Sequence, residues 1–135
     1  MKDTLKPGQE TVRSFEIDVP RTIDFLGEEL RVYATPELVR DIERTYLEFL
    51  QTHCDDGESS VGIGIEVSHS GATPLGGTVT ITARVAEVEG RRVGFEVEAR
   101  DEIEEVGRGR HGRFVVRIDQ LRQRVEQKKA KMAGA

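Results

Sequence analysis

The stretch VYATPELVRDIERTYLEFL, from Val32 to Leu50, is the part of the sequence that decides the fold. Its apolar residues recur at helical spacing and form one stripe, made of Leu38, Ile42 and Tyr46. This pattern predicts an amphipathic helix that buries one face against a sheet. Thr35 is a suitable N-cap and Pro36 suits the first helical position, so we expect the helix to begin there and to end near Gln51.

Glu43 follows Ile42 directly and therefore flanks the apolar stripe. Its spacing alone favours a solvated helix glutamate, paired with Arg40 or Arg44, because glutamates on helices are mostly exposed. The alternative is a carboxylate that faces inward near the edge of the buried stripe. Such a group could attack a carbonyl carbon directly or act as a general base on water.

The apolar period changes from 3.6 to 2 after Gly57, which predicts strands. Four alternating runs follow one another, at residues 61–67, 79–85, 93–99 and 114–118, and an earlier run spans Phe15–Val19 before Pro20. Glu89-Gly90 and Asp101-Glu102 are suited to hairpin connections, and a Pro/Gly loop spans residues 70–77. The sequence therefore predicts an α+β fold, in which a five-stranded antiparallel meander sheet packs on one long helix.

The chain divides into three predicted parts: a loose polar N-terminal segment at residues 1–10, the main domain at residues 11–118, and a basic C-terminal helix or tail at residues 119–135. Asp119 is placed to cap that last helix, which should run to about Lys131. One helix covers only one face of a sheet and leaves an edge strand unpaired. We therefore expect a homodimer.

Composition and charge exclude several classes of protein. No run of 18 apolar residues and no signal peptide are present, and the single Cys54 cannot form an intramolecular disulfide, so a cytoplasmic protein is expected. The net charge is −5; residues 117–135 hold six basic and two acidic residues, a charge of +4, which leaves −9 on residues 1–116. An acidic body argues against nucleic-acid binding. We expect no metal site and no membrane contact.

Four motifs carry a resemblance to a known family: YATPELVRDIE, GIGIEVSHSGATPLG, VEGRRVGFEVEARD and GRGRHGRF. In combination, from about Val32 to Ile118, they resemble the fluoroacetyl-CoA thioesterase group of hotdog thioesterases. The resemblance implies the hotdog fold, in which the sheet wraps a central helix. It also implies hydrolysis of a small acyl-CoA thioester with no cofactor, because coenzyme A is part of the substrate.

The resemblance also assigns roles to individual residues. Thr35, Glu43 and His69 match its catalytic residues, and for Glu43 the match favours a side chain that faces inward near the edge of the buried stripe. Gly62 matches a glycine whose backbone N–H faces the acyl carbonyl, and Arg113 matches an arginine near the active site. Eight residues span about 12 Å along a helix axis, so Thr35 and Glu43 cannot touch within one helix, and a partner's residues could complete the site.

Other interpretations stay open from the sequence. Arg113, with Arg108 and Arg110, either meets the phosphates of coenzyme A or joins a salt-bridge ladder with the glutamates of neighbouring strands. His111 is a rival to His69, and Cys54 is expected to be inert. A short acidic segment, FLGEELR, precedes the helix with Phe25 as its one aromatic residue, so we expect an acyl preference that is broader than fluoroacetyl or different from it. A non-catalytic acyl-CoA-binding protein and a hydratase acting on enoyl-CoA are the alternative functions.

Overall fold

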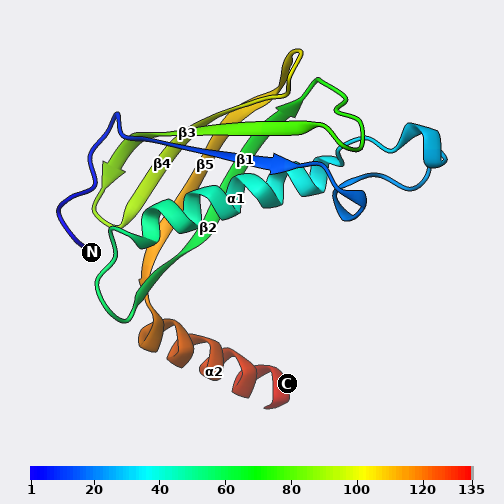
Figure 1. Cartoon of the computed structure of the whole chain (residues 1–135). Helices are drawn as coiled ribbons and strands as arrows, with labels where there is room; N and C mark the ends of the chain where they lie inside the picture. The colour runs from blue at the N-terminus through cyan, green and yellow to red at the C-terminus, as the bar shows by residue number, and fades with distance from the viewer. Residues whose placement is uncertain (135) are drawn as a thin grey trace.

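A computed structural model describes residues 1–134 of the protein (Figure 1). Its strands and helices follow in the order β1 (Glu10–Glu16), α1 (Thr35–Gln51), β2 (Glu58–His69), β3 (Thr78–Glu89), β4 (Arg92–Arg100), β5 (Glu105–Arg117) and α2 (Ile118–Gly134), with short 3-10 turns at Val19–Arg21 and Glu28–Leu30. One five-stranded antiparallel sheet curves over the central helix α1, as the sequence predicts (Figure 1). The C-terminal helix is also present and begins one residue before Asp119.

The strand order is β1-β3-β4-β5-β2, so the sheet is not a simple meander. The hairpins β3–β4 and β4–β5 are confirmed. The prediction is wrong for β2 and β3, which do not pair. The Pro/Gly loop at residues 70–77 carries the chain across the sheet, and β3 pairs with β1 while β2 pairs only with β5. The alternation of apolar and polar residues shows which side chains of a strand share a face, but not which strand pairs with it. The sequence pattern therefore missed this crossover.

Helix α1 buries its predicted stripe completely. Leu38, Ile42, Tyr46 and Leu50 are inaccessible to solvent and pack on the apolar face of the sheet, which includes Val79, Ile81, Val93 and Phe95. Burying a side chain of this size contributes roughly 1.5–3 kcal/mol. The face of the sheet that carries α1 is called the inner face below, and the opposite face is called the outer face.

A β-bulge interrupts β2 between Gly62 and Gly64. Residues directly opposite each other in a sheet share a face. Val61 lies opposite the partly exposed Phe114, whereas Ile65 lies opposite the buried His111. The regular alternation predicted from Val61 to Val67 is therefore broken. The extra residue, Ile63, lets both Gly62 and Ile65 face α1, which a strict period of two would forbid.

The two ends of the chain behave differently. The predicted loose segment at residues 1–10 is anchored, because Leu5 belongs to the core and the amide of Gly8 donates to the carbonyl of Val85 at 2.8 Å. Helix α2 extends away from the sheet and buries none of its residues (Figure 1). It flanks an apolar groove with Val61 and Phe114 of the outer face.

Candidate functional site

Glu43, Gly62 and Arg113 converge on the inner face of the sheet. A Cβ atom built on Gly62 would lie 3.7 Å from Oε1 of Glu43 and 3.7 Å from Nη1 of Arg113. Oε2 of Glu43 is 4.0 Å from the same Nη1. The nearest atom to that Cβ position is Cε1 of His111, at 3.4 Å. The absent side chain of Gly62 therefore leaves a small open space bordered by a carboxylate, a guanidinium and the imidazole of His111. The side chain of Glu43 remains 46% exposed, so the single chain does not bury it as expected; it borders the stripe and lines a shallow groove with Arg40 and Leu47.

Arg113 is fixed by three contacts, two with Ser60 and one with His111. Its Nε donates to Oγ of Ser60 at 2.8 Å, its Nη2 donates to the carbonyl of Ser60 at 2.9 Å, and its Nη1 is 3.2 Å from Nε2 of His111. Burial lowers the pKa of Arg113, and the nearby Glu43 opposes that shift. An arginine side chain nevertheless stays charged at neutral pH. A preorganised cation of this kind can stabilise negative charge that develops on a bound carbonyl.

Thr35 and His69 form a second cluster. The hydroxyl of Thr35 is 2.7 Å from Nδ1 of His69, and the imidazole lies edge-on to the ring of Tyr33. The expected N-cap role of Thr35 is wrong: Ala34 is the N-cap of α1, Thr35 is already helical, and its hydroxyl is engaged with His69. Nε2 of His69 is buried without a hydrogen-bond partner among the described residues. Burial lowers the pKa of His69, which keeps it neutral and able to accept a proton at neutral pH.

The two clusters lie apart in a single chain. Thr35 and Glu43 are separated by about 12 Å of helix rise. His69 and Gly62 lie seven residues apart on β2, which corresponds to roughly 23 Å of extended strand. The structure thus brings the five predicted site residues into two groups, Thr35 with His69 and Glu43 with Gly62 and Arg113, and does not bring the two groups together.

Sequence patterns missed several polar residues that build these clusters. Ser60 gave no signal, because a serine in a strand is unremarkable. Asp41 is buried on α1 and accepts hydrogen bonds from the hydroxyl of Tyr33 at 2.6 Å and from Nε of Arg21 at 2.9 Å. Its position directly before Ile42, beside the stripe, was the available signal. This network holds Tyr33 beneath His69 and fixes the start of α1.

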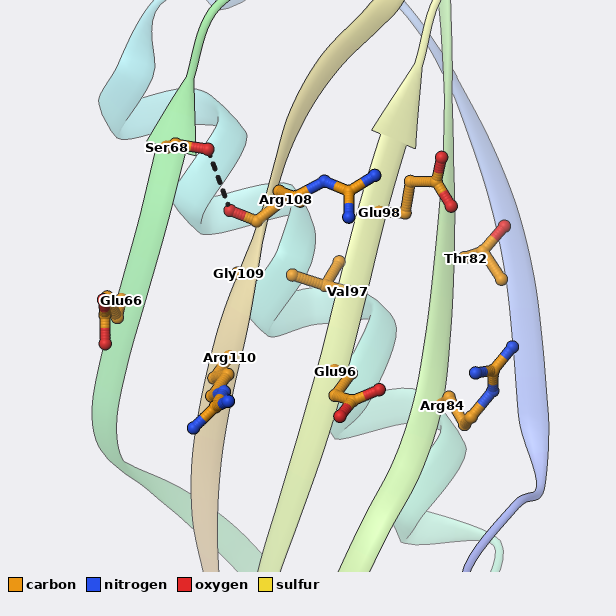
Figure 2. A pocket seen from close by; sticks show the side chains of 10 residues that line it. All are labelled: Glu66, Ser68, Thr82, Arg84, Glu96, Val97, Glu98, Arg108, Gly109 and Arg110. Carbon is orange, nitrogen blue, oxygen red and sulfur yellow. Dashed lines mark hydrogen bonds between the residues drawn. The ribbon is translucent and has the colours of Figure 1, made fainter.

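The outer face offers a larger hollow but a different chemistry. Arg108 and Arg110 lie there with Glu66, Glu96 and Glu98, on the side of the sheet away from α1 (Figure 2). Registers place charges of alternating sign across all five strands, in the order Glu66, Arg110, Glu96, Arg84, Glu10. Arg108 forms an ion pair with Glu105 of its own strand, and Arg110 lies opposite Glu66 and Glu96, whereas Arg113 lies on the inner face.

The residues that the structure describes were also expected to lack a metal site, a membrane span and a reactive cysteine. Residues 1–134 contain no group of three or more histidine, cysteine or acidic side chains that could hold a metal ion. Among the same residues, neither helix is long and apolar enough to cross a membrane. Burial raises the pKa of the Cys54 thiol, which favours the unreactive thiol form and agrees with the expectation that it is inert.

A central helix wrapped by a five-stranded antiparallel sheet is the hotdog-like fold of the thioesterase superfamily. Solved structures agree. A Thermus thermophilus member of the thioesterase superfamily matches with a TM-score of 0.88 and 25% identity, covering 98% of this chain and 99% of that one. A hotdog-like protein from Thermanaerovibrio acidaminovorans matches with a TM-score of 0.83 and 28% identity, covering 90% and 91%.

The family model described as fluoroacetyl-CoA-specific thioesterase matches residues 17–119, and the chain belongs to this family. The fluoroacetyl-CoA thioesterase of Streptantibioticus cattleyicolor is 34% identical over 135 residues, covering 95% of this chain and 97% of that protein. A solved structure of the fluoroacetyl-CoA thioesterase FlK matches with a TM-score of 0.86 and 32% identity, covering 93% of this chain and 98% of that one. The predicted fold and family are confirmed, and with them the enzyme class of acyl-CoA thioesterase.

Proposed function

We propose that the protein hydrolyses short acyl-CoA thioesters, with the acyl carbonyl placed in the open space over Gly62. The observation that carries this proposal is the convergence of Glu43 and Arg113 on that space, at 3.7 Å each from the Cβ position of Gly62. The family supports the substrate class: FlK variants have been solved in complex with acetyl-CoA and with fluoroacetate and CoA.

The chemistry follows from the geometry. The carboxylate of Glu43 either attacks the carbonyl carbon or removes a proton from an attacking water. In both routes the carbonyl oxygen gains negative charge, which the guanidinium of Arg113 and the backbone N–H of Gly62 stabilise. The carbon–sulfur bond then breaks, and the thiol of coenzyme A leaves after taking up a proton. In the general-base route the attacking water has already formed the free acid, whereas in the nucleophilic route a water molecule hydrolyses the mixed anhydride on Glu43, which releases the acid and restores the carboxylate. The neutral imidazole of His69, held by Thr35, is the group we assign to proton transfer.

Because the two clusters lie apart in one chain, we propose that the site is completed in a homodimer. The free edge of β2 is the surface for this contact, and its residues 61–66 are exposed. Two β2 strands that pair antiparallel about a two-fold axis at Glu66 place each His69 opposite the partner's Gly62, since opposite residues share a face and the bulge at Ile63 shifts the register by one residue. Each site then combines Thr35 and His69 of one copy with Glu43 and Arg113 of the other.

Mixing of inactive variants tests both parts of this proposal. Thiol release from short acyl-CoA esters is measured for wild type, Thr35→Ala, Glu43→Ala and a co-expressed mixture of the two variants. A mixed dimer contains one site with both changes and one site with neither, so the mixture should recover about one quarter of wild-type activity. Mixing Thr35→Ala with His69→Ala is the matched control and should recover nothing, because both changes affect the same cluster.

Three results would count against the proposal. Wild type that releases no thiol from any short acyl-CoA ester would remove the function. A monomer in light-scattering measurements that is fully active would remove the shared site. Mixtures of Thr35→Ala and Glu43→Ala that stay as inactive as each variant alone would place all catalytic residues of a site in one chain.

We further propose that the enzyme accepts acyl groups more broadly than fluoroacetyl. The segment before α1 projects beyond the start of that helix (Figure 1), and its one aromatic side chain, Phe25, is 74% exposed rather than folded over Glu43. Without an aromatic cover, the pocket has little means to separate fluorine from hydrogen. The ratio of kcat/KM for fluoroacetyl-CoA and acetyl-CoA tests this; a ratio above about 100, or roughly 3 kcal/mol, would contradict it.

A further inference from the structure

His111 is a buried histidine that the proposed mechanism does not use. It lies on β5 with 3% of its surface exposed, and its ring stacks on Tyr46 of α1 at 5.0 Å with an interplanar angle of 8°. Tyr46 in turn stacks on Phe95 at 4.1 Å. The imidazole is thus packed between the sheet and α1, and this packing restricts rotation of the ring. A polar ring is costly to bury in such a stack unless its nitrogens find partners. Nε2 contacts Arg113, whereas Nδ1 has no hydrogen-bond partner among the described residues.

The contact with Arg113 determines which nitrogen carries the proton. Nη1 of Arg113 is 3.2 Å from Nε2 of His111. A guanidinium has only donors, so Nε2 must accept and the proton must lie on Nδ1. Burial and the positive charge of Arg113 both lower the pKa of His111, to about 4. The ring is therefore neutral at physiological pH, as an acceptor next to a cation has to be.

The same contact controls the direction of the reactive end of Arg113. Ser60 holds Nε and Nη2, and His111 takes one of the two hydrogens on Nη1. The other hydrogen is left for the space shared with Glu43 and Gly62. The distance from Nη1 to Oε2 of Glu43 is 4.0 Å, too long for a direct hydrogen bond. An arginine without the His111 contact could close onto Glu43, forming a tight pair that occupies both groups.

We propose that His111 is a positioning residue of the thioesterase site, a neutral imidazole whose Nε2 accepts from Nη1 of Arg113 and holds that guanidinium apart from Glu43, directed at the space over Gly62. This inference rests on the proposed function, because it gives Arg113 a task in the reaction. It also assigns the buried imidazole a task that a purely structural stack would not need.

Two substitutions separate positioning from packing. His111→Phe keeps an aromatic ring on Tyr46 but removes the acceptor, whereas His111→Gln gives up the ring but can place Oε1 where Nε2 lies. We expect His111→Phe to lower kcat about 10- to 100-fold and to change KM by less than about threefold, since the lost contact acts on the transition state. His111→Gln should recover most of that lost kcat, even if its melting temperature is the lower of the two.

The opposite pattern would overturn the inference: full kcat in folded His111→Phe, or an equal loss of kcat in folded His111→Gln. Nitrogen-15 NMR of the wild-type imidazole provides a readout that does not depend on turnover or on variant folding. The Nδ1-protonated neutral tautomer at pH 7 is expected, and a Nε2-protonated or charged ring would refute the contact. Wild type without thiol release would count against the proposed function, whereas the NMR result bears on His111 and Arg113 alone.

Discussion

Arg110 and Arg113 lie three residues apart on β5, yet they belong to different environments. Arg110 is exposed on the outer face, opposite Glu66 and Glu96 in the charge ladder (Figure 2). Arg113 is 4% exposed on the inner face, where Ser60 and His111 hold it. Odd spacing in a strand places two residues on opposite faces, so the same residue type is exposed among glutamates at one position and buried beside the proposed site at the other.

The difference between the faces is also energetic. Exposed ion pairs contribute about 0–1 kcal/mol and weaken with salt. A buried polar group whose partner is removed costs about 1–3 kcal/mol, because water cannot replace the lost hydrogen bond. Substitutions on the inner face should therefore alter activity and stability strongly, and matched substitutions on the outer face should alter neither.

The largest effect is expected for Glu43→Gln on the inner face. In the proposed mechanism this change removes the charge that attacks the carbonyl or activates water, so kcat/KM should fall about 10³-fold, or about 4 kcal/mol of transition-state stabilisation. Steady-state thiol release measures this. Glu48→Gln, on the same helix and 56% exposed beside Arg13, is the control and should keep wild-type activity. A Glu43→Gln enzyme within tenfold of wild type would remove Glu43 from the chemistry.

The second prediction concerns pH and sharpens the contrast between the faces. The pKa of His111 is about 4 in the folded protein and 6.5 in an ordinary histidine. The unfolded chain therefore binds this proton first, and stability is lost as the pH falls from about 6.5 to about 4. The loss attributable to His111 should be on the order of 3 kcal/mol at pH 4.

Chemical unfolding at pH 7 and pH 4 measures that loss. His53 and His69 also have lowered pKa values, so the comparison of wild type with His111→Gln isolates the part due to His111. The variant should lose less stability on acidification than wild type. An equal loss in both proteins would show that His111 is already charged, or already exposed, in the folded state.

The third prediction compares the two arginines directly. Arg113→Met leaves Oγ and the carbonyl of Ser60 without their donor, and we expect the free energy of unfolding to fall by about 1–3 kcal/mol. Arg110→Met should change it by about 0.5 kcal/mol or less and should leave thiol release unchanged. Urea unfolding of both variants measures the difference. Equal destabilisation would erase the distinction between the faces.

The smallest effect is expected within the ladder itself. Arg84 donates to Oε1 of Glu10 from Nε at 2.9 Å and Nη2 at 2.6 Å, and both side chains are exposed. Arg84→Ala should lower the free energy of unfolding by about 0.5 kcal/mol or less at low salt, and the difference should disappear near 1 M salt. A larger loss that persists in high salt would mean that the ladder acts as a cooperative network.

The sequence determined the elements that depend on local pattern. The stripe of Leu38, Ile42 and Tyr46 predicts α1, because the helical period places those residues on one face. The alternating runs and the Glu89-Gly90 turn predict the hairpins of the later strands. The sequence motifs identified the family. They also indicated five candidate site residues, but not the distances between them: Thr35, Glu43, Gly62, His69 and Arg113.

Only the tertiary structure decided which of those residues meet. The crossover that puts β2 beside β5, and the bulge at Ile63 that turns Gly62 toward α1, depend on pairings between residues far apart in the sequence. The same long-range packing made Thr35 a partner of His69 instead of an N-cap, and made His111 a partner of Arg113. Local periodicity predicts which face of an element a side chain occupies. Which residue it contacts there depends on how the strands pair and how the sheet packs over the helix.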